Sequence, residues 1–191
     1  PYPLDLVFAK NSVSGDWQKQ AEFIQNNLSE NDIRLAFKNL PNEVQDDVSE
    51  DLIKKILVRK KDLPKYALEY FQLLNEKVIL TGTDKKDRFV ITRLRNNETG
   101  IKIIRLKKSG EELESSKIYQ GNLTQEIFLY GLDDDDEFLV EGDEKSTIKL
   151  SLLGGLDNDK YSIENAKKVK IFDYKTKKND FENKGNSRLI L

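Results

Sequence analysis

The sequence predicts an α+β protein, in which a helical N-terminal part packs on a mostly antiparallel β domain, either a sandwich or an open barrel. Apolar residues recur with a helical period up to about residue 75 and with a period of two after it. Nine of the ten glycines lie at or after Gly82, and glycine is excluded from helices but favoured in β-turns. We therefore predict a helical segment at 1–75, a β-rich domain at 76–176 and a linker tail at 177–191.

The helical segment carries start and stop signals. "SEND", from Ser29 to Asp32, resembles a capping box that opens a helix, and Pro41 ends that helix. Ser49 can cap the next helix, and Pro64 can start another. Before them, one apolar stripe has helical spacing: Trp17, Ala21, Ile24 and Leu28. Such stripes predict packing of helix on helix or on sheet rather than a ligand groove.

Short β-branched and aromatic runs follow from Lys77, separated by turn residues. They are "KVILTG", "RFVITRL", "GIKIIRL", "SKIYQG", "EIFLYG", "EFLVEG", "TIKLSLLG" and "KKVKIFDY". In "TIKLSLL" the apolar residues alternate with Lys149 and Ser151, as in a strand with one buried face. Half-buried strands of this kind are typical of antiparallel sandwiches and barrels. "RNNETG" and "KKSGEELES" predict hairpin loops.

Three segments share one pattern, Gly-x4-Asp-x-aromatic, each between two strand-like runs. They are "GTDKKDRF", "GLDDDDEF" and "GGLDNDKY". The shared positions are Gly82, Asp87 and Phe89; Gly131, Asp136 and Phe138; and Gly154, Asp159 and Tyr161. We interpret the three segments as an internal strand–turn–strand repeat.

Each shared position has a physical role in this interpretation. Glycine permits positive φ where a strand turns sharply, and an aspartate side chain can accept hydrogen bonds from the N–H groups of its turn. The aspartate and the aromatic residue are two positions apart, so they point to the same side of the returning strand. We therefore expect the shared Asp136 to be structural. Its neighbours should be exposed, optional charges, because Asp134 and Asp135 align with Lys85 and Lys86.

The acidic turns are also candidate calcium sites, because calcium takes six to eight oxygen ligands. "GGLDNDKYS" resembles the nonapeptide of calcium-binding β-rolls, although Asp157 replaces its fourth residue, a glycine. The candidate ligands are Asp133, Asp134, Asp135, Asp136, Asp157 and Asp159. A turn without metal is the other interpretation, and a hydrolase that holds Mg²⁺ on the same aspartates is a third.

Composition limits the chemistry. The chain has no Cys, His or Met, so cysteine and histidine nucleophile systems and the usual zinc or haem sites are not expected. The 32 basic and 34 acidic residues nearly cancel, so we expect no nucleic-acid partner. No apolar run approaches the roughly 20 residues of a transmembrane helix. We expect no catalytic residues and no cofactor other than possible calcium.

Residues 29 to 179 resemble a region of envelope proteins from Bacteroidetes-type Gram-negative bacteria. The resemblance rests on "LPKYALEYFQLLNEKVILTGTDKKDRFVITR", "EIFLYGLDDDDEFLVEG", "IKLSLLGGLDNDKYSI" and "KKVKIFDYKTKKN". In that family, similar helices and β-turn repeats precede an outer-membrane β-barrel of the surface-antigen, barrel-assembly type. Some members also carry an N-terminal calcineurin-like metallophosphoesterase domain.

The resemblance implies a non-enzymatic accessory or interaction domain of an outer-membrane barrel protein, involved in envelope biogenesis or export. The implied location is the cell envelope, on the periplasmic side or the surface of the outer membrane. The implied partners are envelope proteins or the parent chain's own barrel. A calcium-stabilised, adhesin-like binding module and the magnesium-dependent hydrolase are the alternatives.

Overall fold

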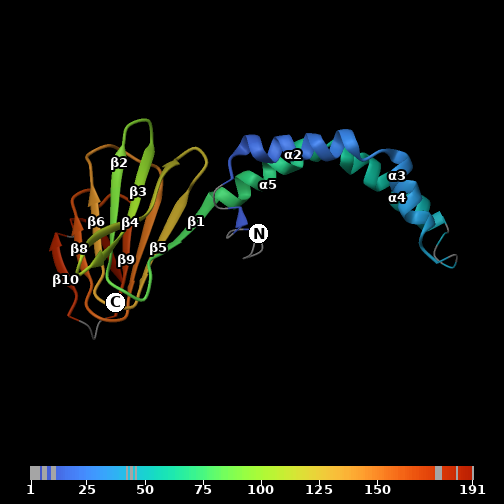
Figure 1. The fold of residues 1–191 in the computed structure, drawn as a ribbon. Helices are drawn as coiled ribbons and strands as arrows, with labels where there is room; N and C mark the ends of the chain where they lie inside the picture. Colours follow the sequence, from blue (N-terminus) through green and yellow to red (C-terminus); the bar gives the residue numbers. More distant parts are fainter. Residues whose placement is uncertain are drawn as a thin grey trace. The chain divides into compact units, whose positions relative to one another are not determined.

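The computed structural model describes residues 5, 8–9, 12–41, 43, 45, 47–174, 178–183 and 185–190. The protein is α+β, with four helices and two sheets in this part of the chain. Contacts divide it into two compact units, Pro1–Leu74 and Asn75–Leu191, and each is described by itself (Figure 1). The predicted packing of the helical part on the β domain stays a prediction.

The helical unit contains α2 (Ser14–Asn27), α3 (Glu30–Lys38), α4 (Asp47–Lys61) and α5 (Leu63–Glu76). The capping box at the start of α3 is confirmed, because the Ser29 N–H donates to Asp32 Oδ2 at 2.8 Å and the Asp32 N–H donates to Ser29 Oγ at 3.1 Å. The cap predicted at Ser49 is wrong. Helix α4 already begins at Asp47, whose carboxylate suits the positive end of the helix dipole.

Few side chains of the helical unit are buried. Those among the described residues are Ala21, Ile33, Ile53, Phe71 and Leu74. Trp17 is half-buried, with its ring 5.8 Å from Tyr70, but Ile24 and Leu28 of the predicted stripe are exposed. No helix in the described part of the chain combines the length and apolarity that a membrane crossing requires.

Two sheets form the β unit. The strands of sheet A, in spatial order, are β1 (Lys77–Thr81), β5 (Glu126–Leu132), β7 (Lys149–Gly155), β9 (Val169–Phe172) and β11 (Arg188–Ile190). Those of sheet B are β10 (Asp180–Asn183), β8 (Lys160–Ile163), β6 (Glu137–Glu141), β2 (Asp87–Leu94), β3 (Glu98–Lys107) and β4 (Gly110–Gln120).

The predicted antiparallel domain is wrong, because most strand pairs are parallel. Seven of the nine pairings among the described strands are parallel, and β2–β3 and β3–β4 are the antiparallel ones. After each acidic turn the chain enters the opposite sheet instead of pairing with the strand it has just left. Side chains alternate in both kinds of sheet, so the period of two did not distinguish them.

Successive coils therefore stack on one another. We define a coil as one strand of sheet A, the connection that follows it and the next strand of sheet B, which gives β1–β2, β5–β6, β7–β8 and β9–β10. The arrangement is a two-sheet parallel β-solenoid. Its inner faces are filled by alternate residues of each strand, such as Ile127, Leu129 and Ile171, which have no exposed surface.

Three further sequence predictions concern the two hairpin loops and the C-terminal tail. The hairpin at "RNNETG" is confirmed, since Asn96 and Asn97 have φ of 58° and 60° between the antiparallel strands β2 and β3. In "KKSGEELES" only the first residues form a turn, and β4 begins at Gly110. The linker predicted at 177–191 is wrong, because β10 and β11 lie within it and extend both sheets.

Candidate functional site

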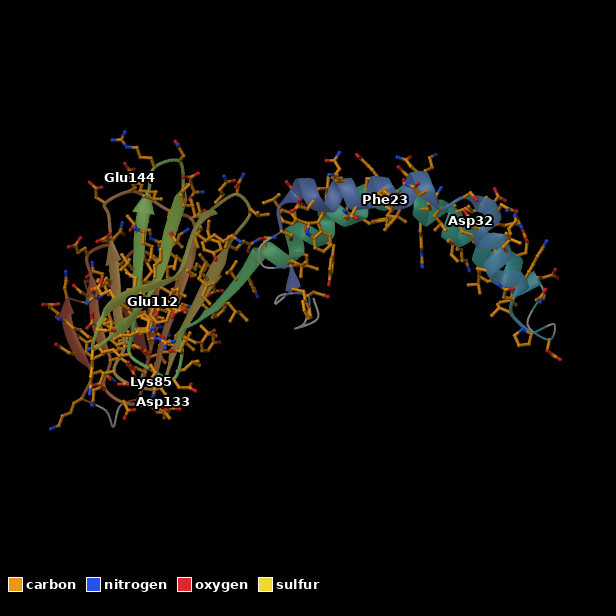
Figure 2. All side chains as sticks on the ribbon, in the orientation of Figure 1. Phe23, Asp32, Lys85, Glu112, Asp133 and Glu144 are labelled. Carbon is orange, nitrogen blue, oxygen red and sulfur yellow. The ribbon has the colours of Figure 1, made fainter. Side chains whose placement is uncertain are left out.

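The three pattern aspartates lie in adjacent coils along one edge of the solenoid. Phe89 pairs with Phe138 and Phe138 with Tyr161 in the parallel register, which aligns the aspartates two residues earlier. Asp87, Asp136 and Asp159 are 0%, 1% and 0% exposed. Figure 2 shows Lys85 and Asp133, from the first two turns, at the same end of the β unit, with Glu144 at the other end.

A ladder of hydrogen bonds joins these aspartates, and we call it the carboxylate ladder. The Asp87 N–H donates to Asp136 Oδ1 at 2.8 Å, and the Asp136 N–H donates to Asp159 Oδ1 at 2.9 Å. Each carboxylate therefore satisfies a buried backbone donor of the preceding coil, which would otherwise be left without a partner.

The predicted bond between each aspartate and its own turn holds for Asp87 alone. The N–H and Oγ1 of Thr83 donate to Asp87 Oδ2 at 2.7 and 2.8 Å. The Arg105 guanidinium donates to Asp87 Oδ1 at 2.9 Å, where the next coil of a longer stack would place a backbone N–H. For Asp136 and Asp159 the prediction is wrong, because their bonds come from the neighbouring coil.

A fourth member of the ladder escaped the sequence pattern. The Asp159 N–H donates to Asn179 Oδ1 at 2.9 Å, and Phe181 lies two residues further on, in register with Tyr161. The signal was the pair Asn179 and Phe181 at the aspartate–aromatic spacing. It was hidden because asparagine replaces aspartate and the connection before it is longer than in the other coils.

The aromatic residues form a second stack beside the carboxylate ladder. The ring centroids of Phe89 and Phe138 are 4.7 Å apart, those of Phe138 and Tyr161 are 5.1 Å apart, and those of Tyr161 and Phe181 are 5.2 Å apart. The interplanar angles are 10° or less. The Tyr161 hydroxyl donates to Asp173 Oδ2 at 2.7 Å, which satisfies its polar end.

The glycines of the pattern make room for the carboxylates. A Cβ on Gly131 would lie 2.2 Å from Asp136 Oδ2 and 2.4 Å from the carbonyl oxygen of Gly154. A Cβ on Gly154 would likewise lie 2.2 Å from Asp159 Oδ2. Neither Gly131 nor Gly154 has a positive φ, so close approach requires these glycines, rather than the turn conformation that the sequence suggested.

The buried carboxyls favour a proton. Burial raises the pKa of Asp136 to about 8 and the pKa of Asp159 to about 7, although the backbone N–H bonded to each carboxylate opposes the change. Neighbouring carboxylates contribute to both increases in pKa. The Oδ2 atoms of both residues are buried without a hydrogen-bond partner, which fits a neutral carboxyl better than an ionised one.

The neighbours of Asp136 are partly structural as well. Asp134 and Asp135 are exposed, but Asp135 Oδ1 accepts the N–H of Asn158 at 3.0 Å. Asn158 Oδ1 in turn accepts the N–H of Lys178 at 2.9 Å, so a second ladder runs outside the first. Asp135 is therefore not the optional charge that the sequence suggested, although Lys86 takes its place in the first coil.

The six candidate calcium ligands do not converge. Asp136 and Asp159 are buried in the carboxylate ladder, whereas Asp133 and Asp134 bond backbone N–H groups of their own turn. Asp157 occupies in the next turn the position that Asp134 occupies in this one, and both residues have a left-handed backbone, with φ of 71° and 70°. Within the described residues, no three acidic side chains are placed to hold one ion. Calcium binding stays a prediction.

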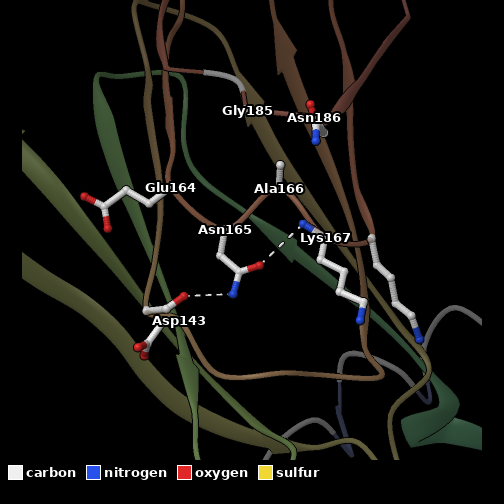
Figure 3. Close-up of a pocket in the computed structure, with 9 residues that line it drawn as sticks. Asp143, Glu164, Asn165, Ala166, Lys167, Gly185 and Asn186 are labelled. Carbon is white, nitrogen blue, oxygen red and sulfur yellow. Dashed lines mark hydrogen bonds between the residues drawn. The ribbon is translucent and has the colours of Figure 1, made fainter.

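The opposite edge of the solenoid contains a polar hollow of about 890 Å³ (Figure 3). Figure 3 shows the side chains of Asp143 and Glu164 on one side of Asn165 and that of Lys167 on the other. Asn165 Nδ2 donates to the carbonyl oxygen of Gly142 at 2.8 Å, so this side chain ties two turns together. No sequence pattern indicated this hollow, because its residue types are common on any polar surface.

Arg93 bonds a residue that lines this hollow, and no sequence pattern indicated it either. It is 3% exposed, and it donates to Thr99 Oγ1 at 3.1 Å and to the carbonyl oxygen of Lys167 at 3.3 Å. Burial lowers the pKa of Arg93 to about 10, which still leaves it charged at neutral pH. Its two bonds connect sheet B with the turn that leads into β9.

No family model, curated protein or solved structure matches this chain.

Proposed function

We propose that this chain is a non-enzymatic interaction module whose β unit is a rigid support. The burial of the turn carboxylates carries the proposal, since Asp87, Asp136 and Asp159 are at most 1% exposed and bond the backbone or Arg105. A general acid or base must reach the proton that it transfers, and a metal ligand must reach its ion. These carboxylates hold turns together instead.

We also propose that the three Gly-x4-Asp-x-aromatic segments are copies of one strand–turn–strand unit. Their equivalent places in adjacent coils support this, as do their shared ladder and aromatic stack. The segment with Asn179 and Phe181 is then a fourth, altered copy. Repeated units that each contact their neighbours give an elongated support with a regular surface.

The proposed setting is the envelope of a Gram-negative bacterium, on the periplasmic side or the surface of the outer membrane. The chain would be an accessory domain of an outer-membrane β-barrel protein, and its partners would be that barrel or other envelope proteins. The resemblance of residues 29 to 179 to such proteins supports this setting.

Photo-crosslinking in cells tests the proposal. A photo-reactive phenylalanine analogue replaces Phe23 in α2 or Leu113 in β4, which are 60% and 59% exposed. We expect both variants in the outer-membrane fraction, with light-dependent adducts to a barrel or another envelope protein; unilluminated cells are the control. A cytosolic chain without envelope adducts would contradict the proposal, as would phosphodiesterase activity that is lost in Asp136→Asn.

A calcium-stabilised module is the second candidate. The exposed carboxylates of Asp134 and Asp135 in one turn favour it, because carboxylate oxygens are calcium ligands. Calorimetry of the chelated protein distinguishes the two, since only a calcium module releases heat on binding and gains unfolding temperature at millimolar Ca²⁺.

A further inference from the structure

The outer face of sheet A carries a continuous apolar row. Tyr130, Leu153, Phe172 and Ile190 are register partners on four adjacent strands, and we call them the outer row. Their sequence neighbours on these strands point into the core, so strand alternation turns the outer row away from it. Ile190 is 37% exposed, and Tyr130, Leu153 and Phe172 are half-buried.

Further apolar side chains widen this row towards the acidic turns. They are Leu132, Leu156 and Tyr174, which are 39%, 51% and 56% exposed. Together with the outer row, they border a shallow groove of about 480 Å³. An apolar surface of this kind on a regular sheet is typical of a protein contact.

Charge changes sign across the outer row. Lys170 and Arg188 lie two residues before it on β9 and β11, are register partners and are exposed. Asp133 and Asp157 lie beyond the row, in the turns after β5 and β7. Lys170 and Arg188 therefore lie on one side of the row and Asp133 and Asp157 on the other, and the two pairs lie on different coils.

We propose that this outer face binds a second copy of the same chain, around a twofold axis that lies in the interface near Leu153. A twofold interface brings the same patch of both copies together. The axis that superposes the basic pair on the acidic pair passes through the middle of the outer row. The two outer rows then cross near Leu153, and Lys170 and Arg188 of each copy face Asp133 and Asp157 of the other.

The size of the face predicts how tightly the copies bind. Five strands about 4.8 Å apart and three to seven residues long, extended by the apolar turn residues, cover roughly 24 by 20 Å, which amounts to about 1,000 Å² over both copies. That is the lower limit for a specific interface and indicates a weak, reversible dimer. We therefore expect dissociation in the micromolar range, and stronger dimerisation at low salt because the charged contacts lie at the rim.

This inference goes beyond the proposed function and does not depend on it. Self-association is measured on the purified chain, whereas the envelope setting is measured in cells. Failure of one measurement therefore leaves the other unaffected.

Sedimentation equilibrium of the full chain between about 5 and 500 μM tests the proposal directly. We expect a monomer–dimer equilibrium, and we expect Leu153→Glu to raise the dissociation constant at least tenfold. Leu113→Glu is the matched control, because Leu113 lies on β4 of sheet B and is 59% exposed. The control variant should dimerise like the natural chain.

Charge reversal tests the orientation. Lys170→Glu with Arg188→Glu gives like charges in one homodimer, and Asp133→Lys with Asp157→Lys gives like charges in the other, so each double variant alone should stay monomeric. Mixed in equal amounts, the two should form a heterodimer, because both of its charged contacts then join opposite charges.

Cysteine substitution provides an independent readout, because the natural chain contains no cysteine. Leu153→Cys lies next to the axis and should form a disulfide-linked dimer under mild oxidation. Lys149→Cys, four residues earlier on β7, lies far from the axis and should not.

Three results would overturn the proposal. One is a monomer at every concentration, as when another surface of the same chain covers the outer face. The second is a dimer that Leu153→Glu leaves unchanged. The third is binding of the monomer to anionic vesicles that Leu153→Glu abolishes, which would assign the face to a lipid surface.

Discussion

At the scale of single residues, the carboxyl of Asp136 illustrates how burial determines protonation. Its Oδ1 accepts a backbone N–H, which favours the charged form, but its buried Oδ2 accepts no hydrogen bond. Burial outweighs the single bond and raises the pKa of Asp136 to about 8. The same balance raises the pKa of Asp159 to about 7. The folded state therefore holds protons that the unfolded chain releases near pH 4.

Stability should accordingly fall as pH rises. Both carboxyls have an ordinary pKa of 3.8, so between about pH 4 and pH 8 the native state binds more protons than the unfolded state. The stabilisation is complete below pH 4 and is lost as pH rises through the folded pKa values. We expect the unfolding temperature of the β unit to fall between pH 5 and pH 8, as measured by calorimetry.

Substitution of Asp136→Asn should reduce this dependence on pH. Asparagine still accepts the Asp87 N–H but has no proton to lose, so the variant should be more stable than the natural chain at pH 8, by about 1–2 kcal/mol. Asp134→Asn is the control, because Asp134 is exposed. A natural chain whose stability rises from pH 5 to pH 8 would refute the protonated ladder.

Gly131 is the second residue whose role the structure makes specific. Gly131→Ala places a methyl group against Asp136 Oδ2 and the carbonyl oxygen of Gly154, and the backbone carbonyl cannot rotate away. We expect a loss of about 2–4 kcal/mol in the free energy of unfolding, as for other overpacked cores. Gly100→Ala in β3 is the control, since its Cβ would meet only Leu94 Cδ1, at 3.4 Å. Equal losses in a urea titration would contradict this account.

At the scale of elements, the aromatic stack and the carboxylate ladder join the coils side by side. Phe138 is in the middle, between Phe89 and Tyr161. Phe138→Leu removes two stacked contacts, each about 0.5–1.5 kcal/mol, together with some packing. We expect a loss of about 2–3 kcal/mol in urea unfolding followed by circular dichroism. Trp17 fluorescence would not serve, because Trp17 belongs to the helical unit.

The control for the stack is Phe128→Leu, because Phe128 lies on the outer face of β5 and not in the stack. It should cost less than half as much as Phe138→Leu. If the two substitutions cost the same, the stack contributes nothing beyond ordinary burial.

The acidic turns should hold without calcium. Asp135 and Asp136 already accept backbone N–H groups, and Asp133 and Asp134 bond within their own turn. We therefore expect 5 mM Ca²⁺ to leave the unfolding temperature of the chelated protein unchanged within about 1 °C, with NaCl of equal ionic strength as the control. A rise of several degrees that Asp133→Asn abolishes would show that the turns bind calcium.

At the scale of the whole molecule, sequence periodicity predicted where helices and strands lie but not how the strands pair. Inner residues such as Ile127 and outer ones such as Phe128 alternate in either kind of sheet. Glycine and aspartate at the turns resemble a hairpin signal, yet Gly131 is required for close approach to Asp136. Parallel stacking depends on contacts between coils 23 to 49 residues apart, such as those from Asp136 to Asp159 and Asp87.

The candidate site was predictable in the same partial way. Spacing identified Asp87, Asp136 and Asp159, because all three retain the aromatic residue two positions later. Arg105 ends the ladder on one side and follows no spacing rule, whereas Asn179 ends it on the other side and keeps only the spacing to its aromatic residue, Phe181. Arg105 supplies the hydrogen-bond donor that a further coil would supply, and Asn179 takes the place of an aspartate after a longer connection. Only the fold therefore shows that both residues belong to the carboxylate ladder.

Amide hydrogen exchange of the turn residues tests the stacked ladder most directly. The N–H groups of Asp87, Asp136 and Asp159 lie where the turns end, yet they donate to carboxylates or to the Asn179 amide oxygen in the neighbouring coil. We predict that NMR will show these amides exchanging as slowly as those of the central strands. The exposed Asp134 amide, bonded to its own neighbour, should exchange far faster. If all four amides exchange at the rate of an open loop, the carboxylate ladder does not exist.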